Sequence, residues 1–493
     1  MQKGFDNERY IELQSQHIRE RINMFGGKLY LEFGGKLFDD YHASRVLPGF
    51  EPDSKIRMLQ SLSSDAEIII TINASDIEKN KVRGDLGITY DEDVLRLCGI
   101  FKGLGFGIGG VVITRYAAQA GADAFRRRLD ATGIPSFVHY SIPGYPADVE
   151  RIVSDEGYGK NEFVPTQKPL VVVTAPGPGS GKMAVCLSQL YHENLRGNKA
   201  GYAKFETFPI WNLPLAHPVN IAYEAATADL DDMNMIDPFH LEAYGKTTVN
   251  YNRDVEVFPV VRAMFERMGG TCPYKSPTDM GVNMAGFAIF DDEACCTASR
   301  LEILYRYYTA LKEDKLKGGD GHTVEKMRLL MNRARVSPDF FPAIAAAKAK
   351  DAQTGAPAGA TVLPNGAIVT GKTSPLLGAA AALLLNALKA TAGIPDEQKI
   401  ISPAALEPIC ELKTKYLKHH NPRLHSDEVL IALTVSATEN PLAAKALAAL
   451  DTLRGTRAHF TVILSPADEK TYKQLGILTT SEPITKQSAM LKH

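Results

Sequence analysis

The chain has 493 residues, of which 45% are hydrophobic and 23% charged, a composition typical of a soluble globular protein with several domains. The chain has 55 Lys and Arg and 57 Asp and Glu, which gives a net charge of −2. It therefore lacks the excess of basic residues that is typical of proteins that bind nucleic acid. The first residues lack the apolar core of a signal peptide, and the longest apolar run, residues 376–385, is shorter than the about 20 residues that span a bilayer. We therefore expect a cytoplasmic protein with neither a nucleic-acid nor a membrane partner.

Apolar, β-branched runs alternate with helical patterns through the first 217 residues. Because strand, helix and strand in repetition are typical of a mainly parallel sheet covered on both faces, we expect an α/β domain over residues 1–217. The expected helices include 91–101 and 117–132, whose apolar residues suit one buried face. The expected strands are 28–33, 67–73, 111–114, 136–140, 170–174 and 202–208.

Two groups of polar residues lie early in this domain and allow two interpretations. A lysine or arginine in either group could clamp a substrate anion, but ordinary surface ion pairing is the simpler interpretation. The first group is Asp39, Asp40, His42 and Arg45; the second is Lys81, Arg83 and Asp85.

A glycine pattern at Gly105-x-Gly107-x-x-Gly110 fits the dinucleotide-binding fingerprint in letters only. An expected helix precedes it and the expected strand 111–114 follows it, whereas a dinucleotide site requires the strand first and the helix second. We therefore expect no cofactor site at these glycines.

The strongest functional signal is the turn that follows the strand 170–174. The segment Pro176-Gly177-Pro178-Gly179-Ser180-Gly181-Lys182 leads directly into an apolar helical pattern that begins with Met183. Successive backbone N–H groups at a helix N-terminus, with a lysine beside them, form a receptor for phosphate. We therefore predict a phosphate-loop-like turn. Its expected binding residues are Gly177, Gly179, Ser180, Gly181, Lys182 and Met183, and Lys182 is also the expected catalytic residue.

This turn departs from the phosphate-loop pattern G-x-x-x-x-G-K-[ST] at both ends. Pro176 replaces the first glycine, and Met183 replaces the hydroxyl residue that normally contacts magnesium. The N–H groups from Gly179 to Met183 remain, so phosphate binding is better supported than magnesium-dependent chemistry. The alternative interpretation is a strand-to-helix turn whose glycines only allow tight packing.

Residues 218–354 have mainly helical patterns, and we expect a helical domain or cap there. Within it, an apolar run ends in Asp291-Asp292-Glu293, a position where a carboxylate could hold a metal ion. Asp291 is the expected metal ligand. The competing interpretation is that Asp291 or Asp292 caps the helix that starts near Glu293. The expected helices are 219–230, 254–268, 293–311, 324–335 and 340–350.

A stretch rich in Gly, Ala and Pro at 354–359 precedes a second expected α/β domain, residues 355–493, with strands 367–370, 429–436 and 458–464. Residues 366–373 match the phosphate-loop pattern letter for letter, but their middle is an apolar strand pattern and cannot form the cradle. Thr373 or Ser374 instead predicts the start of a helix over residues 376–388.

Cysteine and histidine patterns indicate no metal site. The six cysteines show no C-x-x-C spacing, so the sequence predicts neither a disulfide framework nor a zinc site. His419, His420 and His425 lie in a polar stretch and lack the i, i+4 spacing of a zinc hydrolase, which favours a surface turn.

Several segments resemble one bacterial family of unknown function, number eighteen forty-six in the domain-of-unknown-function series. The resemblance runs over nearly the whole length and implies a bacterial cytoplasmic protein, without an assigned activity. The segments that carry it are KLYLEFGGKL at 28–37, RVLPGF at 45–50, APGPGSGKM at 175–183, YKSPTDMGVN at 274–283 and VTGKTS at 369–374.

From the residues we expect a multidomain α/β protein that binds ATP, another nucleotide or a different phosphorylated small molecule. The expected reaction is phosphoryl or nucleotidyl transfer to a small metabolite, in which Lys182 neutralises developing charge. One alternative is an enzyme of a phosphate-bearing substrate or cofactor that works without magnesium. Another is a non-catalytic assembly or regulatory protein in which the turn is structural. A homo-oligomer is compatible with the Ala- and Leu-rich helices.

Overall fold

The computed structural model describes all residues except 1, 36, 39, 84–85, 229–231 and 486–493. The chain divides into two compact units, an N-terminal unit of residues 2–299 and a C-terminal unit that begins at Arg300. Residues 218–299 thus belong to the same unit as the large sheet. The finer boundaries expected at 217 and 354 remain predictions that this division into two does not test.

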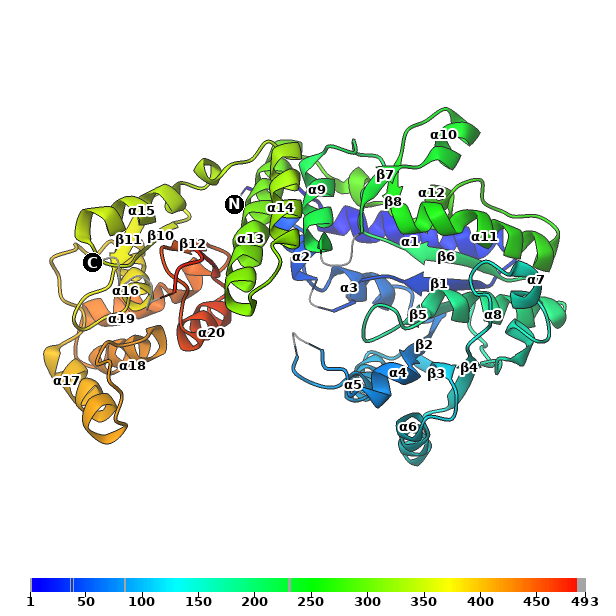
Figure 1. Cartoon of the computed structure of the whole chain (residues 1–493), viewed down its shortest axis with the longest axis horizontal. Coiled ribbons are helices and arrows are strands. Elements are labelled where there is room, and N and C mark those ends of the chain that lie inside the picture. Colours follow the sequence, from blue (N-terminus) through cyan, green and yellow to red (C-terminus); the bar gives the residue numbers. More distant parts are fainter. Residues whose placement is uncertain (1, 36, 39, 84–85, 229–231, 486–493) are drawn as a thin grey trace. The chain divides into compact units, whose positions relative to one another are not determined.

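The N-terminal unit contains a sheet of seven strands in the order β4-β3-β2-β5-β1-β6-β9 (Figure 1). Every pairing between neighbouring strands is parallel, as the alternation of strands and helices predicts. The strands are β1 (Leu29–Phe33), β2 (Ala66–Asn73), β3 (Gly107–Tyr116), β4 (Ser136–Tyr140), β5 (Leu170–Thr174), β6 (Gly201–Phe205) and β9 (Gly281–Val282). A separate antiparallel pair is formed by β7 (Asn234–Ile236) and β8 (Val249–Tyr251).

The helices of this unit fill the connections between its strands. They are α1 (Asn7–Met24), α2 (Tyr41–Val46), α3 (Ser54–Gln60), α4 (Ala74–Glu78), α5 (Tyr90–Gly103), α6 (Ala120–Ala131), α7 (Val149–Ile152), α8 (Lys182–Leu195), α9 (Pro218–Ala226), α10 (Pro238–Tyr244), α11 (Asn252–Gly269) and α12 (Pro277–Met280). Short 3-10 helices occupy Tyr158–Lys160 and Ala285–Ala288. Helix α13 (Asp292–Lys317) begins in this unit and ends in the next.

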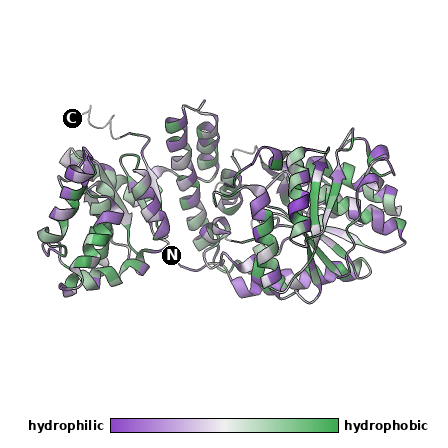
Figure 2. Cartoon of the chain, turned by 90° about the horizontal axis from the view of Figure 1, so that it is seen from below, coloured by the Kyte–Doolittle hydropathy of each residue, from purple (hydrophilic) through white to green (hydrophobic). Residues whose placement is uncertain are grey.

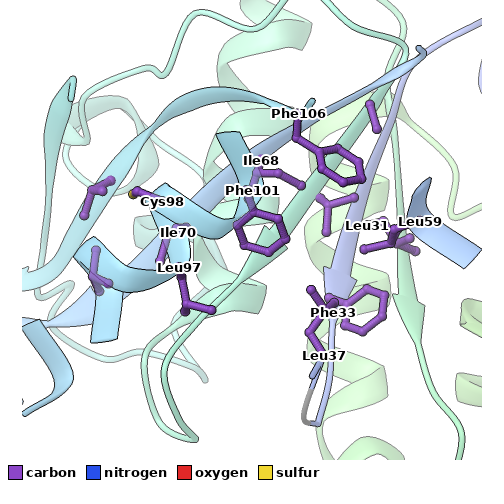
Figure 3. Packing of buried hydrophobic residues seen from close by; sticks show 14 of the residues in the cluster. Leu31, Phe33, Leu37, Leu59, Ile68, Ile70, Leu97, Cys98, Phe101 and Phe106 are labelled. Atoms are coloured by element: carbon purple, nitrogen blue, oxygen red, sulfur yellow. The ribbon is translucent and has the colours of Figure 1, made fainter. Parts of the chain in front are cut away.

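Alternate residues of the strands β1, β2, β3, β5 and β6 enter two different hydrophobic cores, because side chains of a strand point to opposite faces of the sheet. Ile68 and Ile70 face the core that α5 covers, and Figure 3 shows them beside Phe101. Ile69 between them enters the opposite core, where residues such as Leu187 of α8 pack. Both faces of the sheet are therefore buried, which explains why its strands read as continuous apolar runs. In Figure 2 hydrophobic residues accordingly concentrate on the strands.

The C-terminal unit contains a smaller mixed sheet in the order β11-β10-β12-β13. Its strands are β10 (Ala358–Val362), β11 (Ile368–Lys372), β12 (Arg457–Phe460) and β13 (Leu478–Ser481), and only the β12–β13 pairing is parallel among the described strands of this sheet. Its helices are α14 (His322–Arg333), α15 (Pro342–Thr354), α16 (Ala379–Thr391), α17 (Pro403–Glu411), α18 (Ser426–Ser436), α19 (Pro441–Ala448) and α20 (Pro466–Gln474). Shorter helical turns occupy Pro338–Phe340, Leu412–Tyr416 and Leu450–Leu453.

One expected strand in this unit is wrong. Residues 429–436 belong to helix α18, not to a strand. A short apolar run does not reveal its own secondary structure, and here Glu428 stabilises the helix start because its carboxylate accepts the backbone N–H of His425. The second phosphate-loop-like pattern does contain the strand β11, as the sequence predicts.

Candidate functional site

The turn after β5 lies between a buried strand and a helix, in the order that the sequence predicts. All five residues of β5 are buried, and α8 begins at Lys182. Gly181 is the N-cap of α8, has a left-handed backbone with φ +84°, and provides no side chain to cap the helix. Gly179 is also left-handed, with φ +75°. Glycine suits both positions because L side chains rarely adopt this backbone conformation.

The backbone N–H groups of this turn point to no protein acceptor. Across the described residues, no acceptor bonds the N–H of Gly179, Ser180, Gly181, Lys182 or Met183. The first N–H groups of a helix have no partner within the helix and together carry partial positive charge. The turn therefore offers a row of donors to an anion, and Pro176 and Pro178 lie before that row.

Three polar side chains from neighbouring strands hold the turn in place. Thr71 of β2 contacts the hydroxyl of Ser180 at 3.1 Å, and the hydroxyl of Thr114 of β3 donates to the carbonyl of Ser180 at 2.7 Å. The amide of Asn73, at the end of β2, reaches the carbonyl of Gly179 at 3.5 Å. Because these bonds use the hydroxyl and the carbonyls of the turn, its N–H groups are left for another partner.

The turn also lies at the switch point of the sheet. The chain leaves β2 toward β3 on one side, and it leaves the neighbouring strand β5 toward β6 on the other side. The helices that follow therefore cover opposite faces, with α5 on one and α8 on the other. In open parallel sheets, ligands bind in the crevice that such diverging loops create at the carboxyl ends of the strands.

Lys182, the first residue of α8, is partly buried and has no ion pair or side-chain hydrogen bond with any described residue. Burial lowers the pKa of its ammonium group; the carboxylate of Glu32 opposes this effect, and the ammonium of Lys204 adds to it. A partly buried ammonium without a fixed partner among the described residues favours an anionic partner.

A group of charged side chains lies near Lys182 at the carboxyl ends of β1 and β6. Glu32 accepts a hydrogen bond from the hydroxyl of Tyr202 at 2.7 Å. Lys204 pairs with Glu206 at 2.8 Å and also with Asp254 at the start of α11. Burial, with the carboxylate of Asp254 acting in the same direction and Lys204 opposing it, raises the pKa of the Glu206 carboxyl. A carboxyl group that retains its proton near neutral pH can exchange that proton with a substrate.

Asp291 has a clear structural role. Its Oδ1 accepts a hydrogen bond from the backbone N–H of Ala294 at 3.0 Å, which caps α13, and its Oδ2 accepts one from Gln2 at 2.8 Å. This is the capping arrangement that the sequence also allows. A metal-binding role for Asp291 remains an untested prediction.

A second group of potential metal ligands, which was not predicted from the sequence, includes Asp292, the residue that follows Asp291. His217, Asp292 and Cys296 bring Nε2, a carboxylate oxygen and Sγ to within 4.8 Å of one another. The only local signal is the spacing of four residues between Asp292 and Cys296, which places both on the same face of a helix. His217 comes from a distant part of the sequence.

The early polar residues form ion pairs within the protein. Asp40 pairs with Lys55 at 2.7 Å, and Arg83 pairs with the buried carboxylate of Asp93 at 2.8 Å. Lys81 pairs with Asp76 at 3.3 Å. Asp39 and Asp85 lie outside the described residues. The described pairs are internal ion pairs, but the interpretation as surface pairing is wrong for Asp40 and Arg83, because their partners Lys55 and Asp93 are buried.

A parallel sheet buried on both faces, with diverging loops at the carboxyl ends of β2 and β5, defines the class of open, doubly wound α/β proteins. Among the helices of the described residues, none has both the length and the apolar composition needed to cross a membrane.

Comparison with known sequences then identifies the family. The N-terminal model of the domain of unknown function DUF1846 matches residues 3–335, and its C-terminal model matches residues 339–491. The chain belongs to the DUF1846 family, which confirms the resemblance seen in its sequence. Similar relatives include the UPF0371 proteins of Streptococcus pneumoniae strains JJA, CGSP14 and P1031. Each is 56% identical over 481 residues, which cover 98% of this chain and 97% of the relative. These names specify no ligand or reaction.

Proposed function

We propose that the turn between β5 and α8 binds the phosphate group of a nucleotide, such as ATP, or of another phosphorylated small molecule. The observation that carries this proposal is the row of five N–H groups from Gly179 to Met183 at the start of α8, for which the described residues provide no acceptor. The switch-point position and the ammonium of Lys182, which pairs with no described residue, support the same conclusion.

The reaction that best fits this arrangement is phosphoryl or nucleotidyl transfer to a small metabolite. The N–H groups and Lys182 would stabilise negative charge that develops on the phosphate in the transition state. Glu206, whose raised pKa keeps a proton available, lies in the charged group near Lys182. Phosphoryl transfer needs mainly positioning and charge stabilisation, and both are tasks that fixed donors perform.

A second candidate is an enzyme that holds a phosphate-bearing substrate or cofactor without magnesium. Met183 has no hydroxyl to contact the metal, and the nearest hydroxyl in the turn, that of Ser180, is buried and bonded to Thr71. The usual protein ligand for magnesium in phosphate loops is therefore missing here. This observation favours binding through the backbone and Lys182 alone.

The test is calorimetric titration of nucleotides and phosphorylated metabolites into the wild type, Lys182→Ala and a matched control. Lys246→Ala is the control, because Lys246 is exposed and follows the C-cap of α10, so it does not belong to the turn between β5 and α8. We expect a ligand that binds wild type and Lys246→Ala equally and Lys182→Ala at least about tenfold more weakly. Equal binding by all three proteins, or no ligand in the panel, would contradict the proposal.

The same titration with magnesium and with a chelator separates the two candidates. A phosphoryl or nucleotidyl transferase that uses magnesium binds its nucleotide more tightly when the metal is present, because the metal bridges the phosphates. Unchanged affinity in the chelator favours the magnesium-independent enzyme.

A further inference from the structure

A cluster of three different ligand atoms lies at the start of α13, in the N-terminal unit. Nε2 of His217 is 3.0 Å from Oδ1 of Asp292 and 3.5 Å from Sγ of Cys296, and Sγ is 3.7 Å from Oδ2 of Asp292. We refer to these three residues as the His-Asp-Cys cluster. None of them belongs to the turn or to the charged group near Lys182.

Local structure explains how the cluster forms. Asp292 opens α13 and Cys296 lies four residues later, so both side chains project from the same face of the helix. His217 is the N-cap of α9, immediately before Pro218, where the helix begins. The two helix starts thus meet at the cluster, and each position is fixed by backbone geometry.

The spacing of the cluster fits a tetrahedral metal site. With Zn–N and Zn–O bonds of about 2.0 Å and a Zn–S bond of about 2.3 Å, tetrahedral geometry separates neighbouring ligand atoms by about 3.3 to 3.6 Å. The separation of 3.5 Å between Nε2 and Sγ lies in this range. Asp292 places one oxygen, Oδ1, 3.0 Å from Nε2 and its other oxygen, Oδ2, 3.7 Å from Sγ, so its carboxylate lies beside both of the other ligand atoms. Imidazole, thiolate and carboxylate together suit zinc better than the harder magnesium or calcium ions.

We propose that His217, Asp292 and Cys296 bind a zinc ion, with water as the fourth ligand. The side chain of Asp292 is 62% exposed and that of His217 is 10% exposed, so one side of the cluster is open to solvent. Three protein ligands and an open position are the arrangement found in zinc sites that activate water. A zinc ion with a bound water suits a substrate that is hydrolysed or that contains a carbonyl group. This proposal does not depend on the function proposed for the turn.

Zinc binding has an identifiable local cost. Nδ1 of His217 accepts the backbone N–H of Val219 at 3.3 Å, so in the metal-free protein Nε2 carries the ring proton and donates it to Asp292. When zinc binds Nε2, the ring proton moves to Nδ1 and this long cap hydrogen bond is lost. The thiol proton of Cys296 leaves to solvent, because the thiolate is the metal ligand.

Cobalt(II) is the probe that tests the site, because it replaces zinc and its spectrum reports thiolate ligation. The full-length protein is stripped with a chelator and titrated with cobalt(II), and the near-ultraviolet thiolate charge-transfer band and the visible bands are recorded. We expect one cobalt per chain with tetrahedral bands, which zinc displaces. Absence of these bands in the wild type would overturn the proposal.

Two variants and a matched control assign the ligands. Cys296→Ser should lose the charge-transfer band, whereas Cys295→Ser should retain it, because Cys295 packs next to Gly4 and is not in the cluster. Asp292→Asn changes an exposed side chain, and we expect it to fold normally and to bind zinc at least about tenfold more weakly. An unchanged band in Cys296→Ser, or unchanged zinc affinity in Asp292→Asn, would refute the assignment even if Cys296→Ser folds poorly.

Discussion

Lys204 and Glu206 lie two residues apart at the carboxyl end of β6, and their side chains form an ion pair of 2.8 Å while only 14% and 9% exposed. The spacing of two places both on the same face of the extended chain, the face toward Asp254 and Tyr202. The carboxylates of Glu206 and Asp254 therefore share the ammonium of Lys204 in a poorly solvated place. Burial, together with two negative charges at one ammonium, raises the pKa of Glu206.

This arrangement predicts how stability depends on pH. The pKa of Glu206 in the folded protein is raised from an ordinary 4.5, so its stabilising contribution is complete below that ordinary value and is lost as pH rises through the folded value, about 8. Glu206→Gln cannot ionise and should lose less stability than the wild type between these limits. Urea unfolding midpoints across this range test the prediction. Substitution of the exposed Glu242 by Gln is the control. The prediction would be wrong if the unfolding midpoints of Glu206→Gln and of the wild type changed with pH in the same way.

The two left-handed glycines of the turn predict different costs of substitution. Gly181→Ala should destabilise the protein by about 1–2 kcal/mol plus a steric cost, because its new Cβ would lie 3.3 Å from the side chain of Thr114. Gly179→Ala should incur only the backbone cost, since no atom lies within 4 Å of its new Cβ. Chemical unfolding of both variants measures the difference. Equal destabilisation would show that the contact with Thr114 is unimportant.

The hydroxyl of Thr114 predicts a link between stability and ligand affinity. Thr114→Val keeps the side-chain shape but leaves the carbonyl of Ser180 without this donor, which should cost about 1–3 kcal/mol. The phosphate binding that we propose for the turn should also weaken, because Ser180 is less firmly held. Thermal unfolding and calorimetry measure the two effects. Thr132→Val removes an exposed hydroxyl bond at a helix end and should change neither quantity appreciably.

In the C-terminal unit, Asp468 predicts acid sensitivity. Its carboxylate accepts bonds from Ser426, Ser465 and His425, which hold the pKa of Asp468 far below its usual value against the opposing effect of burial. Its contribution to stability is therefore complete above the ordinary pKa of 3.8 and is lost as pH falls below it. Asp468→Asn should lower stability at neutral pH by about 2–3 kcal/mol and flatten the acid limb of the stability curve.

Unfolding of Asp468→Asn and of the exposed control Asp451→Asn at several pH values checks this prediction. If Asp468→Asn is as stable as the wild type at neutral pH, the hydrogen bonds that Asp468 accepts from His425, Ser426 and Ser465 make no net contribution to the free energy of unfolding.

The large sheet was predictable because its signals are local. Residues 170–174 are apolar on both faces of the strand, which is typical of a buried parallel strand, and residues 67–73 contain the β-branched run 68–72; both segments are strands in the structure. The expected order of a helix followed by a strand around Gly107 is also seen, although β3 (Gly107–Tyr116) is longer than the expected strand 111–114. By contrast, β9 is only two residues long and has no periodicity to detect.

The candidate site was predictable only in part. The turn before Lys182 could be recognised from consecutive residues, but its position beside β2 depends on the order of strands, which the sequence did not provide. The His-Asp-Cys cluster was missed because His217 and Asp292 are far apart in the chain and meet only through packing of two helix starts. Cysteine spacing alone could not detect it.

Because Thr71 and Thr114 fasten the turn to two strands, the shape that we propose for phosphate binding would be set before any ligand arrives. A molecule that docks there has little loop disorder to remove, so most of the interaction energy is retained as affinity. Preorganisation of this kind favours simple, single-step association kinetics, whereas a loop that folds around its ligand would add a slower rearrangement.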